Sequence, residues 1–162
     1  MKITVFADTH RNYNALNAVV NQNLDSDLFL HIGDGQFELL EVASAHPDKK
    51  FLMVKGNRDY GSLDDERIID LDEFKIYCNH GHELDVNSGL EKLLDKAAYN
   101  DCKIAVYGHT HLFKTDLING IYVMNPGSLE SPRGKNPPTY GVIKISDGGE
   151  IIMNIIEYKS NV

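Results

Sequence analysis

The alternation of strand-like and helix-like segments in the first third of the chain constrains the fold most strongly. Short apolar, β-branched segments predict strands at residues 2–6, 28–32 and 51–54. Between them, helical spacing of apolar residues predicts helices over about residues 13–24 and 37–45. Strands and helices that alternate with short connections are typical of a parallel sheet with helices packed against it.

The remainder of the chain predicts mostly antiparallel strands. Strand-like segments lie at residues 67–71, 73–78, 103–107, 140–145 and 151–156, and residues 90–97 have helical spacing. Asn119-Gly120 is typical of a tight hairpin turn, and Asp147-Gly148-Gly149 marks a second hairpin. We therefore expect a single domain over residues 1–162 of the α/β class, with two stacked mixed β-sheets flanked by helices.

Composition limits the classes of function. Lys and Arg number 16 and Asp and Glu number 24, which gives a formal net charge of −8. This charge disfavours binding to a nucleic-acid polymer or to an anionic membrane. The apolar runs are too short for a membrane span or a secretory signal peptide. Cys78 and Cys102 fit reduced, buried thiols, so we expect a cytoplasmic protein.

Five predicted strand ends carry Asp, Asn or His next to Gly. Ligand sites in α/β sheets lie beyond the carboxyl ends of strands, and glycine permits the tight turns that bring such ends together. Oxygen and imidazole donors suit Mn, Fe, Ni, Co or Zn, and so many candidates fit two ions with a shared carboxylate better than one. The candidate ligands are Asp8, His10, Asp34, Asn57, His80, His109 and His111.

The order of these blocks resembles the calcineurin-like metallophosphoesterase superfamily. Its pattern D-x-H, G-D, G-N, H and G-H-x-H occurs here in order within residues 8–111. The sequence Asn125-Pro126-Gly127-Ser128, followed by Pro132-Arg133, is similar to the small YfcE-like phosphodiesterase branch. The resemblance implies an αββα sandwich and two divalent metal ions, with Mn²⁺ typical and Ni²⁺, Fe²⁺ or Zn²⁺ as alternatives.

The same resemblance implies a ligand set and a reaction. One metal would be held by Asp8, His10, Asp34 and His111, and the other by Asp34, Asn57, His80 and His109, with Asp34 bridging. A hydroxide bridging the metals would attack phosphorus in line. The expected catalytic residues are Asp34, Asn57, Arg58, His80 and His109.

Arg58 stands where many members of the family carry His. Arginine stays protonated, so it cannot act as a general acid, but it can bind a phosphoryl oxygen. This substitution favours phosphodiesters, or esters with good leaving groups, over broad monoester hydrolysis. The alternative is that Arg58 only forms an ion pair with the neighbouring Asp59.

Further histidines and arginines are assigned from their positions. Arg58, Arg11 and His82 are candidates for substrate binding, and Arg11 could join Arg133 and Lys135 in a basic rim. His31 is expected to pack in the core or behind the ligands, and His46 to lie on the surface.

The expected substrate is a small phosphodiester or a nucleotide, with no nucleic-acid polymer and no membrane as partner, and a homodimer is expected. Two alternatives remain open at this point. One is a phosphomonoesterase or nucleotidase. The other is a protein-binding scaffold on the same fold, as in the retromer subunit that resembles these enzymes.

Overall fold

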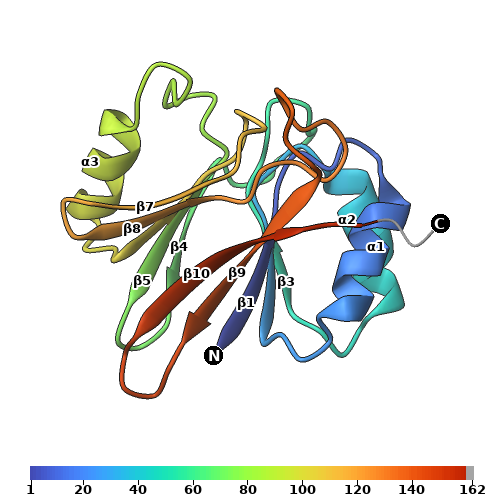
Figure 1. Cartoon of the computed structure of the whole chain (residues 1–162), viewed down its shortest axis with the longest axis horizontal. Helices are drawn as coiled ribbons and strands as arrows, with labels where there is room; N and C mark the ends of the chain where they lie inside the picture. The colour runs from blue at the N-terminus through green and yellow to red at the C-terminus, as the bar shows by residue number, and fades with distance from the viewer. Residues whose placement is uncertain (160–162) are drawn as a thin grey trace.

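The alternating first third of the chain forms one sheet, as predicted. In the computed structural model, which describes residues 1–159, β1 (Lys2–Phe6), β2 (Leu28–His31) and β3 (Phe51–Met53) run parallel. They are connected by α1 (Tyr13–Gln22) and α2 (Gln36–Ala45), which pack together on the outer face of this sheet (Figure 1). The Asn12 side chain accepts a hydrogen bond from the Ala15 N–H at 2.9 Å and caps α1.

The end of the described chain completes the first sheet. β9 (Thr139–Ile145) pairs antiparallel with β1, and β10 (Ile151–Glu157) pairs antiparallel with β9. The strand order is β10-β9-β1-β2-β3. The predicted hairpin at residues 146–150 therefore lies at the edge of a mixed sheet.

The second sheet has the order β4-β5-β6-β8-β7. Its strands are β4 (Glu66–Asp70), β5 (Lys75–Asn79), β6 (Ile104–Val106), β7 (Lys114–Ile118) and β8 (Ile121–Asn125). The sequence predicted mostly antiparallel pairing here, but β5, β6 and β8 run parallel to one another. Both Asn119 and Gly120 have positive φ, 52° and 79°, as the tight turn between β7 and β8 requires.

Three apolar layers hold the sandwich together, and Figure 1 shows α3 (Glu91–Tyr99) and the α1–α2 pair on its opposite sides. Side chains such as Ile3, Val5 and Ile104 fill the space between the sheets. Phe6 points to the other face of β1 and packs with α1 and α2, and Leu93 packs α3 on the second sheet. The inner strands are apolar on both faces because both faces are covered.

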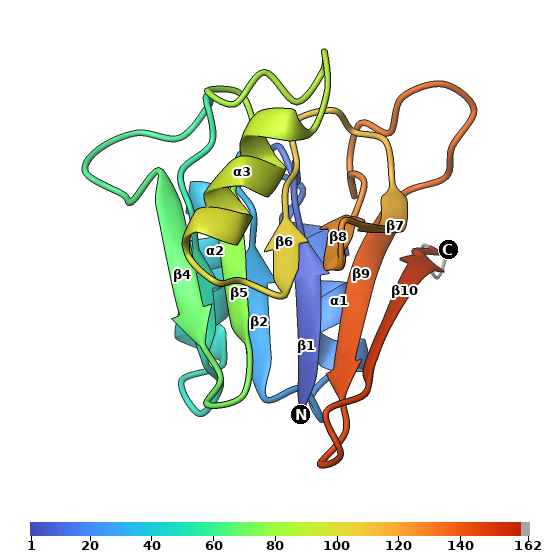
Figure 2. The same ribbon diagram turned by 90° about the vertical axis from the view of Figure 1, so that its left-hand side faces the viewer.

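The loops that follow β1, β2, β3, β5 and β6 gather at one edge of the sandwich, at the top of Figure 2. Backbone hydrogen bonds join them: the Asp8 N–H donates to Gly33 O, and the Gly108 N–H donates to His80 O, each at 3.0 Å. The second of these bonds is possible because β5 and β6 are parallel neighbours.

Two further observations concern the described residues. Within residues 1–159, no helix has the length and apolar character that crossing a membrane requires. Cys78 and Cys102 are both buried free thiols, and burial raises the pKa of each.

Candidate metal centre

Most of the candidate ligands have a backbone conformation that residues other than glycine rarely adopt. Asp8, His10, Asp34, His109 and His111 all have positive φ, between 41° and 65°. This conformation costs about 1–2 kcal/mol per residue. The strained backbone turns five side chains from the two sheets toward a common point. Such strain is concentrated at functional sites.

Gly33 and Gly56 permit the loops after β2, β3 and β5 to approach closely. A Cβ atom on Gly33, which has φ +86°, would lie 2.7 Å from both His80 Nδ1 and the Gly56 backbone N. A Cβ atom on Gly56 would collide with the Asp34 carboxylate. Any larger residue would therefore push the two sheets' loops apart.

One group of side chains, which we call the outer group, consists of Asp8, His10 and His111. The His111 Nε2 atom lies 3.4 Å from Asp8 Oδ1, and His10 Nε2 lies 3.9 Å from the same oxygen. The two Nε2 atoms are 3.2 Å apart. The neighbouring Asp8 carboxylate raises the pKa of His111, and the Ser131 carbonyl oxygen lies 2.6 Å from His111 Nδ1.

A second group, the inner group, consists of the buried residues Asp8, Asp34 and His80. The His80 Nε2 atom lies 3.6 Å from Asp34 Oδ2 and 3.9 Å from Asp8 Oδ1. The Ile32 carbonyl lies 2.6 Å from His80 Nδ1, so that nitrogen carries the proton and Nε2 presents its lone pair.

Asn57 and His109 extend the inner group. Asn57 Oδ1 lies 3.2 Å from His80 Nε2 and 3.1 Å from His109 Nδ1. Burial, together with the neighbouring His80, lowers the pKa of His109 and so favours its neutral form. A neutral imidazole is the form that binds a metal.

Asp8 provides the strongest indication that these groups hold cations. Its Oδ2 accepts the His109 backbone N–H at 2.9 Å, but its Oδ1 is buried and has no hydrogen-bond partner. An unpaired buried carboxylate oxygen is costly, and here it faces imidazole nitrogens of both groups. The donors are oxygen and imidazole nitrogen, which are suitable ligands for divalent cations.

The structure brings together all seven predicted ligands, as the distances above describe. Asp8 belongs to both groups, whereas Asp34 belongs to the inner group. The Arg58 backbone N–H donates to Asp34 Oδ1 at 2.7 Å and leaves Oδ2 facing His80. The bridging role of Asp34 therefore stays a prediction, and Asp8 is the carboxylate that the geometry shares between the groups.

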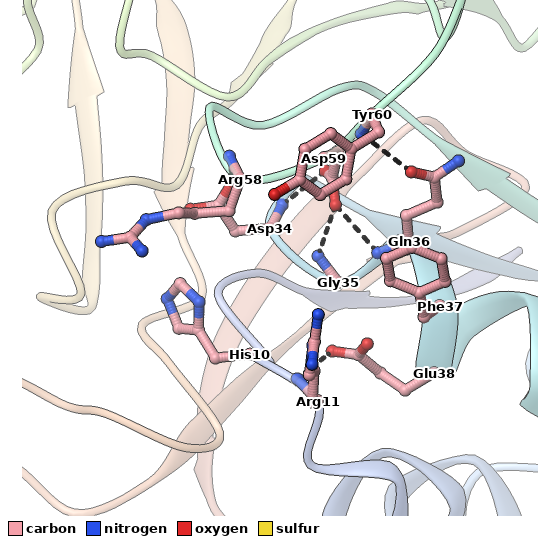
Figure 3. Close-up of a pocket in the computed structure, with 10 residues that line it drawn as sticks. All are labelled: His10, Arg11, Asp34, Gly35, Gln36, Phe37, Glu38, Arg58, Asp59 and Tyr60. Atoms are coloured by element: carbon pink, nitrogen blue, oxygen red, sulfur yellow. Dashed lines mark hydrogen bonds between the residues drawn. The ribbon is translucent and has the colours of Figure 1, made fainter.

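Asp59, which from the sequence was only an alternative ion-pair partner for Arg58, holds the loops after β2 and β3 together. Its carboxylate accepts the backbone N–H groups of Asp34, Gly35, Gln36 and Gly56, at 2.7, 3.0, 2.9 and 2.8 Å. Burial alone raises the pKa of Asp59, but these hydrogen bonds outweigh it and the pKa is lowered. Within residues 1–159, Asp59 makes no ion pair with Arg58, whose side chain points away from it (Figure 3).

Asn125 and Ser128 also hold the motif loops in place. The Ser128 hydroxyl donates to the Asp8 carbonyl at 2.7 Å, and the Asn125 amide donates to the Gly108 carbonyl at 2.9 Å. In the sequence these residues stood out only by their resemblance to the YfcE-like branch. Asn125 ends β8 and Ser128 follows it closely, so both lie at a strand end, as the ligands do.

The remaining histidines lie largely where they were expected. His31 is fully buried, 2.9 Å from the Thr9 hydroxyl, and burial lowers its pKa. His46 is partly exposed. The His82 ring lies 5.5 Å from the His80 ring and 6.1 Å from the His109 ring, between centroids, so it borders the inner group.

Two adjoining cavities open on this centre. One, of about 180 Å³, is lined by His10, Asp34, Asn57, Arg58, His109, His111 and Arg133. The other, of about 240 Å³, shares His10, Asp34 and Arg58 with the first and extends to Arg11 (Figure 3). Arginine side chains thus surround a carboxylate-rich centre, an arrangement that suits an anion bound on cations.

Comparison with known proteins agrees with the fold and with the predicted family. The model of the calcineurin-like phosphoesterase superfamily domain matches residues 1–148, and the chain belongs to this family. It is 37% identical over 73 residues to the phosphodiesterase YfcE of Escherichia coli, a match that covers 45% of this chain and 36% of YfcE.

Solved structures show the same fold. A predicted phosphoesterase from Streptococcus pneumoniae superposes with a TM-score of 0.84 at 25% identity, over 99% of this chain and 94% of that one. Vps29 from Entamoeba histolytica, in a complex with Zn²⁺, superposes with a TM-score of 0.73 at 23% identity, over 98% of this chain and 100% of that one. The same fold therefore occurs in proteins named as phosphoesterases and in proteins named for vacuolar sorting.

Proposed function

We propose that this protein is a metal-dependent phosphodiesterase that acts on a small phosphodiester or nucleotide. The observation that carries the proposal is the unpaired, buried Asp8 Oδ1 between two sets of imidazole nitrogens, next to a cavity that Arg58 and Arg133 line. If this edge of the sandwich served only for packing, the buried Asp8 Oδ1 atom would have a hydrogen-bond partner.

The residues divide into those that would hold metal and those that would hold substrate. The proposed ligands are Asp8, His10, Asp34, Asn57, His80, His109 and His111. Two divalent cations would supply Lewis acidity, an activated water and neutralisation of phosphoryl charge. Mn²⁺ is the proposed metal, and Ni²⁺, Fe²⁺ and Zn²⁺ are the alternatives.

Arg58 and Arg133 would bind the oxygens of the phosphate group. Both line the cavity over the ligands, and each guanidinium can donate two parallel hydrogen bonds to a phosphate. Because Asp59 is occupied by four backbone N–H groups, Arg58 is available for this role. The permanent charge of Arg58 means that it stabilises charge but does not deliver a proton to the leaving group.

This lack of an acid at Arg58 supports diester over monoester substrates. His82 and Arg11 remain candidates for substrate contact, His82 beside the inner group and Arg11 in the adjoining cavity. The buried thiols of Cys78 and Cys102 are in keeping with the proposed cytoplasmic location. The homodimer stays a prediction.

A protein-binding scaffold is the second candidate, supported by the shared fold of Vps29. A phosphomonoesterase or nucleotidase is the third. A protein-binding scaffold needs no metal chemistry, so it would not require a complete set of metal ligands. The two enzymatic candidates differ in the number of ester groups on the favoured phosphate.

One assay separates these candidates. Purified protein, loaded in turn with Mn²⁺, Ni²⁺, Fe²⁺ and Zn²⁺, is given bis-p-nitrophenyl phosphate or p-nitrophenyl phosphate. We expect faster turnover of the diester and loss of activity in Asp34→Asn. Faster turnover of the monoester would favour the phosphomonoesterase. Inactivity of both wild type and variant with every metal would favour the scaffold.

A further inference from the structure

Two aromatic side chains stand exposed beside the metal centre. Phe37, at the start of α2, is 54% exposed, and Tyr60, after β3, is 66% exposed. Their ring centroids are 6.4 Å apart with an interplanar angle of 46°. Both line the cavity that also contains His10 and Asp34 (Figure 3).

The pair is held by the same loops that carry the ligands. The Tyr60 backbone N–H donates to Gln36 Oε1 at 2.9 Å, which ties the loop after β3 to the first turn of α2. Asp59 binds the Gly35 and Gln36 N–H groups from the adjacent position in the chain. The backbone segments that carry the two rings are therefore tied to the loops of the metal centre, while the side chains themselves are exposed.

A cation completes this surface. The Arg11 guanidinium lies 5.8 Å from the centroid of the Phe37 ring, within the range of a cation–π contact. The Arg11 backbone N–H donates to Glu38 Oε1 at 2.8 Å, and Glu38 is buried. Arg11, Phe37 and Glu38 also line a neighbouring cavity of about 380 Å³, so there is room for a group larger than the rings themselves.

These observations point to a subsite for part of the substrate. Exposed aromatic faces next to a guanidinium bind planar π-systems by stacking and by cation–π attraction. We propose that Phe37, Tyr60 and Arg11 bind a planar aromatic group carried by the phosphate ester, either a nucleobase or an aryl group. This inference rests on the proposed phosphoesterase function, because it takes the phosphate to lie on the metal centre.

The test measures binding without turnover, so its outcome does not depend on hydrolysis. Isothermal titration calorimetry of the Mn²⁺-loaded protein compares phenylphosphonate with ethylphosphonate. A second comparison uses the phosphonate analogues of AMP and of ribose 5-phosphate. Tighter binding of phenylphosphonate alone indicates aryl esters, and tighter binding of the AMP analogue over the ribose analogue indicates nucleotides.

The variants are Phe37→Ala and Tyr60→Ala, with Phe37→Tyr and Tyr60→Phe as conservative replacements. Tyr99→Ala is the matched control, because Tyr99 is 87% exposed but lies on α3. We expect each alanine variant to bind the preferred aromatic ligand about 5- to 100-fold more weakly. The aliphatic ligands should bind unchanged, and the conservative and control variants should bind as wild type.

Two results would overturn the subsite. The first is equal affinity of the wild type for each aromatic ligand and its aliphatic counterpart. The second is an equal loss of affinity for both kinds of ligand in the alanine variants, which would indicate a disturbed metal centre. If the enzyme assay finds no hydrolysis but aromatic preference and its loss are observed, the subsite holds and the proposed reaction fails.

Discussion

The inner and outer ligand groups share Asp8 but differ in how the protein supports them. The inner group of Asp8, Asp34 and His80 is buried, and each member lies within three residues of the end of a strand. In the outer group, His10 and His111 are partly exposed, and a loop carbonyl, that of Ser131, orients His111. The inner group is thus part of the core, whereas the outer group depends on loops that border the substrate cavity.

The largest effect is expected where the two groups meet. Asp8→Asn removes the carboxylate that faces both groups, so both sites should lose affinity for metal. Loss of a residue that only supports a metal ligand lowers activity by up to about 100-fold. Loss of Asp8 itself should lower activity further. Metal content by plasma mass spectrometry and diester turnover measure this. Retention of one metal per chain in the variant would show that Asp8 serves a single site.

A comparison of two histidines tests the difference between the groups. His80→Ala empties a buried position, so the metal-free protein should lose about 2–5 kcal/mol of unfolding free energy, as for other large-to-small core changes. His111→Ala should change the stability of the metal-free protein much less, while weakening metal binding. Urea unfolding with chelator and metal titration provide the two measurements. Equal destabilisation by the two variants would contradict the proposed division.

Two glycines with similar φ angles allow the cost of backbone strain to be measured separately from the cost of crowding at the metal centre. Gly33 and Gly61 have φ of +86° and +80°, but a Cβ atom on Gly61 would meet nothing within 4 Å. Gly61→Ala should therefore cost about 1–2 kcal/mol from backbone strain alone. Gly33→Ala should cost clearly more and should lower metal affinity, since its Cβ would press on His80 Nδ1. Thermal unfolding and metal titration of both variants test this expectation.

The smallest expected effect concerns Asp59 and depends on pH. The folded state lowers the pKa of Asp59, so its stabilisation is fully present above the unfolded pKa of about 3.9 and is lost as the pH falls through the folded pKa. Asp59→Asn should destabilise the metal-free protein by about 1–3 kcal/mol near neutral pH. The difference from wild type should shrink below about pH 4.

Urea unfolding between acid and neutral pH measures this difference. Asp147→Asn, in the exposed turn before β10, is the control and should match wild type throughout. A difference between Asp59→Asn and wild type that persisted unchanged into acid would mean that the charge of Asp59 is not what holds the loops.

The sequence predicted the elements near the site closely. The segments at residues 2–6 and 37–45 correspond to β1 and α2 within one residue at each end. These predictions succeed because the spacing of apolar residues is a local property of the sequence. It follows from whether one face or both faces of an element are buried. The parallel neighbours β5, β6 and β8 were not predicted, because strand order depends on contacts between segments far apart in the chain.

The candidate ligands themselves were visible as polar residues beside glycine at strand ends. The role of Asp59 was not, because it depends on four N–H groups from two loops that converge only after folding. The Phe37–Tyr60 pair was also hidden, since Phe37 lies at the start of α2 and Tyr60 follows β3, and only folding brings the two rings together.

The sequence by itself determined the chemistry that is available: which donors exist, in what order, and on which kinds of element. Tertiary structure decided how they are shared, with Asp8 between two groups, Arg58 free of Asp59 and an aromatic pair beside the centre. The physical reason is that residue type and local periodicity act along the chain. Distance, burial and competition for hydrogen bonds are set between strands that only packing of the two sheets brings together.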